Sequence, residues 1–353
     1  MRTYPRFKAC AAHVAPVYLD TDKTIEKACG LIGEAARNGA QIIAFPESFI
    51  PGFPVWAALQ APIHGHELFK LLAAQSVAVP GPEIQRLCMA ARQHGILVSV
   101  GISEATPNSV GCLWNSNLLI GSDGSILNHH RKLVPTFYEK LIWANGDGVG
   151  LRVSSTEIGK IGMLICGENT NPLARFALMA QGEQLHISSY PPTWPTRDPA
   201  DAGRYDLANA IRVRAGAHAF EAKVFNVVSA AYLDQSIEKA IEPLGKDAVR
   251  ILKDTPAGVS MVLGPQAEQI GETLCENEGL LFADIDLSAA VEPKQFHDVV
   301  GYYNRFDIFR MSVENDRREP INLKDREGAR SYPFEEIENQ SKTGDAPFRA
   351  VPA

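Results

Sequence analysis

Apolar residues in the first half of the chain recur with two spacings, which predict alternating strands and helices. Short continuous apolar runs are typical of buried strands, and apolar positions three or four residues apart are typical of a helix with one buried face. Turn and stop signals such as Asn38-Gly39 separate these segments. In chain order we expect a strand at 7–14, a helix at 20–38, a strand at 41–45, a helix at 82–94, a strand at 96–101, and a hairpin of strands 113–120 and 125–131 around the turn 121–124.

The second half repeats this order of elements. No linker rich in serine or glycine separates the halves, so one domain is expected rather than two. Strands that alternate with helices predict sheets covered by helices on their outer faces. The expected elements are strands at 151–155 and 160–165, a helix at 172–181, a strand at 185–189, a long helix at 200–222, and strands at 224–231, 257–263 and 279–285, with a polar turn at 266–272 before the last strand.

The pattern changes near residue 312. The segment 312–353 is dense in charged residues, proline and asparagine and cannot build a core alone. We therefore predict a main domain at 1–311 and a polar C-terminal tail at 312–353. Two interpretations of the tail stay open, a solvated end and an arm laid over a neighbouring subunit. Its few apolar anchor positions include Ile321, Leu323, Phe334 and Ile337.

Composition narrows the class of protein. Of the 353 residues 45% are hydrophobic and 21% charged, with a net charge of −7 and no basic stripe, which argues against a nucleic-acid partner. Apolar stretches stay well short of the roughly 20 residues that a membrane helix needs, so no membrane partner is expected. The N-terminal segment makes a poor signal peptide because His13, Pro16 and Asp20 interrupt its apolar run. A cytoplasmic protein is the default expectation.

The cysteines and histidines do not predict a metal site. Six cysteines are scattered along the chain without a Cys-x-x-Cys pair, as expected of structural thiols in a reducing compartment. His129 and His130 are adjacent in a predicted strand, where neighbouring side chains point to opposite faces.

One cysteine is placed differently from the rest. Cys166 closes the apolar run Ile161–Ile165 and precedes a helical pattern, so it lies where a buried strand turns towards a helix. The N-terminal end of a helix favours the thiolate, which is the nucleophilic form of cysteine. The alternative interpretation is a small buried hydrophobic residue, which is the usual role of a cysteine at the end of an apolar run.

Two further segments with chemical character also follow apolar runs. The first is Phe45-Pro46-Glu47-Ser48, and the second extends from His130 through Lys132 to Thr136. Alone, Glu47 would be read as a helix cap and Lys132 as a solvated charge. Together with Cys166 they place a carboxylate, an ammonium and a thiol at strand ends, and this combination predicts an active site.

These segments resemble the carbon–nitrogen hydrolase superfamily, and within it the nitrilase branch. The likeness extends from about residue 6 to 311, in four separated motifs in the same order. The matching segments are Phe45-Pro46-Glu47, His130-Arg131-Lys132 with Pro135-Thr136 and Glu139, and Cys166-Gly167-Glu168-Asn169, with branch-specific stretches at 51–56, 143–148 and 180–186.

The resemblance implies an α/β fold, a four-layer α-β-β-α sandwich, with the catalytic triad Glu47, Lys132 and Cys166. Glu139 matches the second glutamate of the family and either positions a water or holds Lys132 in place. No cofactor and no metal are implied. The family also implies homodimers that assemble into larger homo-oligomers or helical filaments.

The chemistry of a nitrile substrate asks for the same groups. A thiolate attacks the C≡N carbon, a carboxylate takes the thiol proton, and a cation or N–H donors stabilise charge that develops on nitrogen. The expected products are a carboxylic acid and ammonia, through a thioimidate and a thioester on Cys166, with some amide as a by-product.

Substrate preference is not predicted. Gly167 stands where many nitrilases have tryptophan, and it either admits a wider substrate or lets the turn pack. Residues 301–307 also depart from the common pattern of the family. We name Trp56, Tyr138, Gly167, Tyr190 and Trp194 as substrate-binding candidates, although each aromatic residue has a core or interface interpretation as well.

Two other function classes stay open. An amidase or carbamoylase of the same superfamily would share the triad but start from a carbonyl group. A non-catalytic scaffold protein would be expected to lack a member of the triad, and none is missing from this chain.

Overall fold

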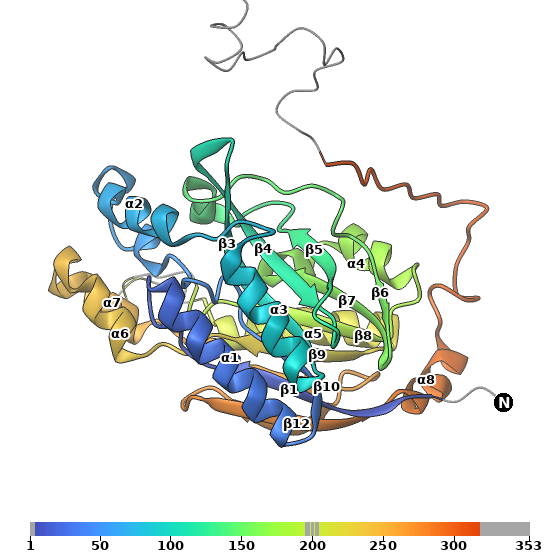
Figure 1. Ribbon diagram of the computed structural model, residues 1–353. Coiled ribbons are helices and arrows are strands. Elements are labelled where there is room, and N and C mark those ends of the chain that lie inside the picture. Colours follow the sequence, from blue (N-terminus) through green and yellow to red (C-terminus); the bar gives the residue numbers. More distant parts are fainter. Residues whose placement is uncertain (1–3, 195–197, 199–200, 202–204, 318–353) are drawn as a thin grey trace, which may run out of the picture. The chain divides into compact units, whose positions relative to one another are not determined.

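Two six-stranded mixed sheets form the centre of the molecule in the computed structural model, which describes residues 4–194, 198, 201 and 205–317 (Figure 1). The first sheet has the strand order β12 (Gly279–Asp286), β1 (Arg6–His13), β2 (Ala40–Ala44), β3 (Leu97–Thr106), β4 (Ser109–Ile120), β5 (Ile126–Arg131). The second has the order β11 (Gln269–Leu274), β10 (Ser260–Leu263), β9 (Phe225–Ala230), β8 (Leu185–Tyr190), β7 (Gly159–Ile165), β6 (Ser154–Thr156).

The alternation of side chains along the strands explains the layers. In β1, Ala9 and Ala11 lie in the core between the sheets, whereas Cys10 and Ala12 lie in a second core with the outer helices. Helices α1 (Thr21–Arg37) and α3 (Pro82–His94) pack in that second core, side by side over the first sheet (Figure 1).

The second sheet is covered in the same way. Helix α5 (Leu207–Ala222) packs against β8, β9 and β10, and α4 (Pro172–Met179) packs against Leu164 of β7. The order of layers is therefore helix, sheet, sheet, helix. The predicted four-layer α-β-β-α sandwich is confirmed.

Sheet direction places the ends of several strands together. Strands β1, β2 and β3 are parallel, β4 is antiparallel to β3, and β5 is antiparallel to β4, so β2 and β5 run the same way. Strands β7, β8 and β9 are also parallel. Glu47 follows β2, Lys132 follows β5 and Cys166 follows β7, so all three candidates lie just after the carboxyl ends of strands. Ligand sites of α/β sheets favour this position.

Several element predictions were wrong. The predicted turn 266–272 overlaps β11, an edge strand whose half-exposed residues are mostly polar and give no apolar run. The helix predicted from residue 200 begins at Leu207, where the Asp206 side chain accepts the Asn209 amide as an N-cap. Helices α2 (His66–Gln75), α6 (Gln235–Ile241), α7 (Lys246–Asp254) and α8 (Val291–Phe296) were not predicted.

The predicted tail is described only in part. Arg317 Nε lies 3.3 Å from Asp147 Oδ2, so the first residues of the tail contact the main domain. Residues 318–353, which include the predicted anchors, lie outside the described residues. Among the helices that the structure does describe, none is both long and apolar enough to cross a membrane.

Candidate active site

Two carboxylates and one ammonium form a continuous buried chain at the ends of β2 and β5. Lys132 Nζ lies 2.7 Å from Glu47 Oε1 and 2.5 Å from Glu139 Oε2. Each of the three residues is at most 1% exposed. Burial disfavours the charge of Lys132, but Glu139 and Glu47 outweigh it and raise the lysine pKa. Lys132 is therefore held as an ammonium between two carboxylates.

The two oxygens of Glu47 have different surroundings. Oε1 accepts hydrogen bonds from Lys132 Nζ and from Asn115 Nδ2, the latter at 2.7 Å. Oε2 is buried and has no hydrogen-bond partner among the described residues. Burial raises the pKa of Glu47 to about 7, and Glu139 adds to this while Lys132 opposes it. A carboxylate with this pKa can both take and return a proton near neutral pH.

Glu139 is fixed by a short 3-10 turn, η3 (Phe137–Leu141). Thr136 and Glu139 form a capping box at its start, in which Glu139 Oε2 accepts the Thr136 amide at 3.0 Å. The same oxygen bonds Lys132 Nζ. The turn thus directs one Glu139 oxygen to the lysine.

Cys166 begins the 3-10 turn η4 (Cys166–Thr170) directly after β7, with φ of 49°. This left-handed backbone is uncommon for a residue with a side chain. The thiol lies close enough to Glu47, Lys132 and Glu139 for the charges of these side chains to act on its pKa.

The expectation of a thiolate stabilised by a helix end was wrong. Burial and the Glu47 carboxylate raise the pKa of the Cys166 thiol well above its ordinary value, although Lys132 opposes them. The turn after Cys166 is a short 3-10 segment, and α4 begins only at Pro172, so the helix dipole is too far away to dominate. The resting form is a thiol that needs a base.

Two residues that the sequence analysis gave no chemical role hold the Cys166 turn. Glu168 accepts the Ile165 amide at 2.8 Å, His130 Nε2 at 2.9 Å and the Leu133 amide at 2.6 Å. The carboxylate thus ties the Cys166 turn to the segment that carries Lys132. Asn169 Nδ2 donates to Cys166 O at 3.1 Å and to Leu164 O at 3.3 Å.

Three of the four aromatic candidates, Tyr138, Tyr190 and Trp194, lie near these charged groups. Trp56 packs with Tyr138 in a separate core cluster. Tyr138 and Trp194 stack with ring centroids 5.8 Å apart, and Trp194 and Tyr190 pack in the same core cluster as Cys166. The charges of Cys166 and Glu47 help to raise the pKa of both Tyr138 and Tyr190, after burial. Each of the four aromatic candidates has one buried polar atom without a hydrogen-bond partner among the described residues. These atoms are Trp56 Nε1, Tyr138 Oη, Tyr190 Oη and Trp194 Nε1.

Gly167 lies against Thr136 of the capping box. A Cβ at position 167 would stand 2.7 Å from Thr136 Oγ1, closer than the two atoms can approach without movement. Of the two interpretations offered by the sequence, this contact favours the packing of the turn.

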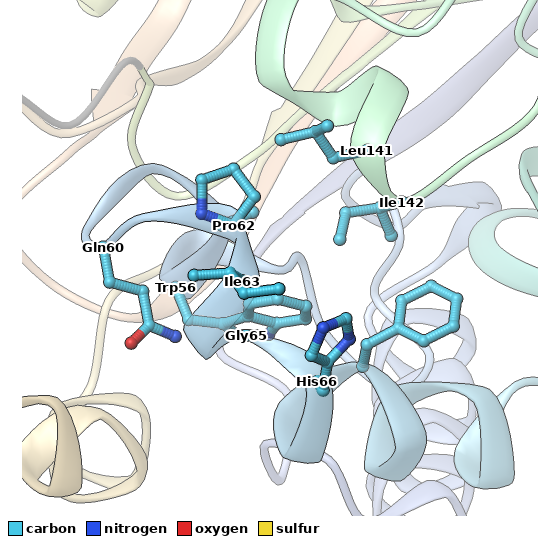
Figure 2. Close-up of a pocket in the computed structure, with 10 residues that line it drawn as sticks. Trp56, Gln60, Pro62, Ile63, Gly65, His66, Leu141 and Ile142 are labelled. Atoms are coloured by element: carbon cyan, nitrogen blue, oxygen red, sulfur yellow. The ribbon is translucent and has the colours of Figure 1, made fainter.

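A mostly apolar cavity of about 390 Å³ is lined in part by the aromatic candidate Trp56. Figure 2 shows Leu141 and Ile142 of the η3 region facing Trp56 and Ile63 across it, with Gln60 and His66 at its edges. Since η3 also carries Tyr138 and Glu139, this one turn contributes both to the group of buried charges around Lys132 and to the wall of the cavity.

Of the residues predicted from the sequence, Glu47, Lys132, Glu139 and Cys166 lie together, with Tyr138, Tyr190 and Trp194 beside them, whereas Trp56 lies in a neighbouring core cluster. The sequence analysis missed other residues of the site. It gave no role to Asn115, whose strand position looks like that of any other polar residue. Glu168 and Asn169 belong to the quoted motif, so a signal existed. Their roles as hydrogen-bond partners depend on backbone atoms that no motif displays.

Comparison with known proteins assigns the chain to a class. The family model described as carbon-nitrogen hydrolase matches residues 8–295. A nitrilase of Paraburkholderia phymatum is 34% identical over 311 residues, which cover 88% of this chain and 87% of the relative. A cyanide hydratase of Botryotinia fuckeliana is 33% identical over 340 residues, 92% of this chain and 86% of the relative.

A solved structure supports the fold. It is a mutant of the amidase from Nesterenkonia sp. AN1 that shows covalent addition of the acetamide moiety of fluoroacetamide at the active site cysteine. The two chains superpose with a TM-score of 0.60 and 18% sequence identity, covering 82% of this chain and 93% of the amidase.

Proposed function

The chain belongs to the carbon–nitrogen hydrolase family, and from this premise we propose that it is a nitrilase, which converts an organic nitrile to a carboxylic acid and ammonia. The observation that carries the proposal is the difference in hydrogen bonding between the two carboxylate oxygens of Glu47. One oxygen is fixed by Lys132 and Asn115, and the other is free of hydrogen bonds among the described residues and can accept a proton. A base of this kind is what the buried Cys166 thiol requires.

In the first step Glu47 takes the thiol proton as Cys166 Sγ attacks the nitrile carbon. The new C–S bond forms as one C–N π bond breaks, and the nitrogen takes a proton from Glu47, which leaves a thioimidate on the enzyme. Lys132 uses two of its three N–H groups on Glu47 and Glu139, so the third is available to stabilise charge on nitrogen.

Two water molecules complete the reaction. Glu47 removes a proton from the first water, which adds to the thioimidate carbon. Glu47 passes that proton to the nitrogen, and then transfers the proton of the added hydroxyl to the nitrogen as well. As the C=O bond forms, the C–N bond breaks, ammonia leaves and a thioester remains. The second water, activated by the same carboxylate, releases the carboxylic acid and restores the Cys166 thiol. Glu139, fixed by the capping box, keeps Lys132 in place throughout.

The tetrahedral intermediate after the first water has two possible leaving groups. If nitrogen is protonated, ammonia leaves and acid follows. If sulfur leaves first, the product is the amide. Some amide is therefore expected beside the acid, and more from nitriles whose nitrogen is poorly basic.

Nitrile and amide substrates separate the proposal from the amidase alternative. Purified protein is incubated with aliphatic nitriles, aryl nitriles and arylacetonitriles, and with the matching amides, and acid, amide and ammonia are measured. A nitrilase releases ammonia from the nitriles and little from the amides. Ammonia from the amides with no nitrile turnover would overturn the proposal in favour of an amidase.

The cyanide hydratase among the relatives supplies a second candidate reaction. The cavity beside Trp56, about 390 Å³ and lined largely by apolar side chains, favours a substrate with an apolar group over hydrogen cyanide. We therefore propose a nitrile with an apolar substituent as the substrate class. Formamide production from cyanide, without turnover of any nitrile in the panel, would favour the hydratase.

A further inference from the structure

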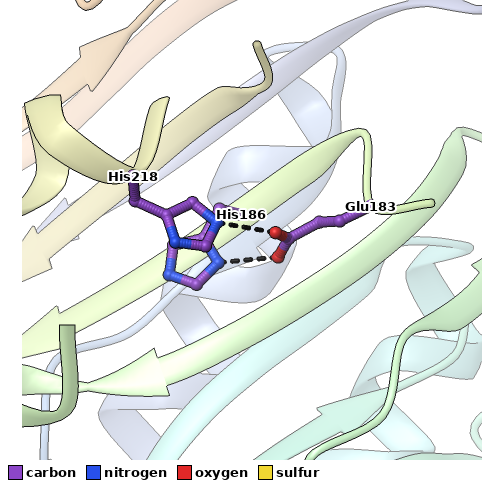
Figure 3. Close-up of side chains that lie close together, drawn as sticks. All are labelled: Glu183, His186 and His218. Atoms are coloured by element: carbon purple, nitrogen blue, oxygen red, sulfur yellow. Dashed lines mark hydrogen bonds and ion pairs between the residues drawn. The ribbon is translucent and has the colours of Figure 1, made fainter. Parts of the chain in front are cut away.

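Three titratable side chains form a buried cluster to which the proposed mechanism gives no role. The Glu183 cluster consists of Glu183 in the turn before β8, His186 on β8 and His218 on α5. The three residues are at most 3% exposed. Figure 3 shows the two imidazoles stacked on one side of the glutamate, and their centroids are 3.8 Å apart.

Short hydrogen bonds join the members of the Glu183 cluster. Glu183 Oε1 lies 2.6 Å from His186 Nδ1, and Oε2 lies 2.6 Å from His218 Nε2 (Figure 3). The two imidazoles outweigh burial and lower the pKa of Glu183 to about 2. Gly162 of β7 makes the room, because a Cβ at that position would overlap the Glu183 carboxylate.

The Glu183 cluster reaches the Cys166 turn through Asn169. Two carbonyl groups, Leu164 O and Cys166 O, accept hydrogen bonds from Asn169 Nδ2. The amide oxygen of Asn169 must then be the acceptor for His186 Nε2, at 2.9 Å. His186 therefore carries a proton on Nε2. The 2.6 Å contact between its Nδ1 and Glu183 Oε1 requires a further proton between these two atoms, although burial and His218 lower the pKa of His186 to about 4.

We infer that the Glu183 cluster positions the nucleophile by holding Asn169 against the backbone on both sides of Cys166. The inference rests on the proposed role of Cys166. A left-handed backbone at a residue with a side chain costs about 1 kcal/mol or more, so it persists only where surrounding contacts impose it. The two Asn169 hydrogen bonds are such contacts, and His186 fixes the orientation of the amide that makes them.

The same three residues are also of the types that bind metal ions, and their ligand atoms lie within 4.8 Å of one another. The geometry favours shared protons over a metal. Ligand atoms around a tetrahedral zinc are about 3.3 Å apart, given zinc–ligand distances near 2.0–2.1 Å. The oxygen and nitrogen atoms of the Glu183 cluster are 2.6 Å apart, as in strong hydrogen bonds.

Substitutions of His186 and Asn169 test this inference. His186→Leu removes both ring nitrogens, whereas His186→Gln keeps an N–H near the position of Nε2 for Asn169. Asn169→Asp keeps the shape of the side chain but removes the donor to the two carbonyls. A matched control is His13→Leu, which removes a buried histidine whose hydrogen bonds go to Ser260 and Cys275 instead.

Two readouts are made well below the melting temperature of each variant. The first is the rate at which iodoacetamide alkylates Cys166, measured by peptide mass spectrometry. The second is kcat and KM for the best nitrile of the panel. A small displacement of a reacting group can cost on the order of 100-fold in rate. His186→Leu and Asn169→Asp should therefore lower both the alkylation rate and kcat by about 10- to 100-fold, with KM within about threefold.

His186→Gln should recover most of the loss, and His13→Leu should lower the melting temperature without changing either rate. Wild-type rates per folded molecule in His186→Leu and Asn169→Asp would reduce the Glu183 cluster to a structural role and overturn the inference. If His186→Leu does not fold, Glu183→Gln takes its place beside Asn169→Asp, because it removes the carboxylate that holds His186 Nδ1. It should lower both rates, and wild-type rates in it would overturn the inference.

Two further results have separate consequences, a bound metal and the absence of nitrile turnover. One equivalent of a metal in the purified wild-type protein, lost in His218→Ala, would overturn the shared-proton arrangement. If the wild-type protein converts no nitrile, the proposed function fails, but the alkylation rates still test the positioning of Cys166.

Discussion

At the scale of single residues, the candidate site depends on a base and a nucleophile that are both buried. Burial raises the pKa of the Cys166 thiol, so the resting cysteine is protonated. It also raises the pKa of Glu47 to about 7, so this carboxylate accepts a proton more readily than an ordinary glutamate does. Burial therefore keeps the nucleophile protonated at rest and also makes the Glu47 carboxylate a stronger base.

The pH dependence of the reaction should report Glu47. The carboxylate must be ionised to take the thiol proton, so kcat/KM should fall as the pH is lowered through about 7. Glu47→Gln should lower kcat/KM by about 100- to 1000-fold and remove this acid limb. If kcat/KM of Glu47→Gln still falls at low pH with the same midpoint, a group other than Glu47 is responsible for this pH dependence.

The charged residues of the site could be predicted from the sequence, but the residues that hydrogen-bond to them could not. Glu47, Lys132, Glu139 and Cys166 stand in segments that follow apolar runs and match a known family, so both pattern and resemblance point to them. Asn115, which fixes one oxygen of Glu47, lies inside a strand without such a signal. The raised pKa of Cys166 was missed because burial depends on the packing of both sheets.

At the scale of elements, the site is assembled by turns that contact one another across the two sheets. The Cys166 turn meets the Thr136 capping box at Gly167, and Glu168 bonds the backbone on both sides. The turns that carry the nucleophile, the lysine and the second glutamate are thus joined by direct contacts.

Gly167→Ala tests this coupling. The added Cβ must displace Thr136, which caps the turn that carries Glu139, so kcat should fall by about tenfold. Thr136→Ala removes both the obstacle and the cap, so the double variant should lose less than the product of the single losses. Gly30→Ala is the control, because a Cβ there meets nothing within 4 Å. Independent losses in the double variant would mean that the two turns are not coupled.

Strand β3 is joined to β5 by a buried charge cluster whose stability contribution depends on pH. Glu104 bonds His129 at 2.8 Å and Arg131, and these partners outweigh burial to lower its pKa from 4.5 to about 2. The stabilisation is therefore present above pH 4.5 and is lost as the pH falls towards 2.

Glu104→Gln should lower the free energy of unfolding by about 2–3 kcal/mol at neutral pH. The difference from wild type should shrink below pH 4.5, which chemical denaturation at a series of pH values would measure. Glu67→Gln, which removes an exposed partner of Lys70, should change stability little. A Glu104→Gln difference that does not vary with pH would contradict the linkage.

Elements with strong periodicity were predicted well, and those that rely on tertiary contacts were not. The buried strands β1, β2 and β8 and helices α1 and α3 lie close to their predicted limits because their apolar patterns are continuous. Helices α2, α6 and α7 bury few residues each and pack in a satellite core with Trp56 and Tyr138. Their patterns are too short to indicate a helix.

At the scale of the whole molecule, assembly remains a prediction. The family resemblance implies homo-oligomers, and the segment 312–353 is either a solvated end or an arm laid over a neighbouring subunit. Its first residues contact the main domain through Arg317 and Asp147. Two truncations, after Met311 and after Arg317, separate this local contact from any role of the remaining tail.

If the tail orders on a partner subunit, both truncations should lower the mass of the oligomer and weaken activity, as measured by light scattering and specific activity. If only the contact near Arg317 matters, the shorter protein alone should change. Unchanged mass and full activity in both would leave the segment 312–353 without a role in assembly.

If Cys166 carries the substrate during hydrolysis of a nitrile, a covalent adduct forms on this residue during turnover. Wild-type protein is quenched in acid during turnover of the best nitrile, and the mass of the peptide that contains Cys166 is measured. The expected added mass is that of the nitrile for the thioimidate, or that of the acyl group less one hydrogen for the thioester, and Cys166→Ala should give neither product nor adduct. Acid production by Cys166→Ala, or an adduct on another residue during turnover, would contradict this role of Cys166.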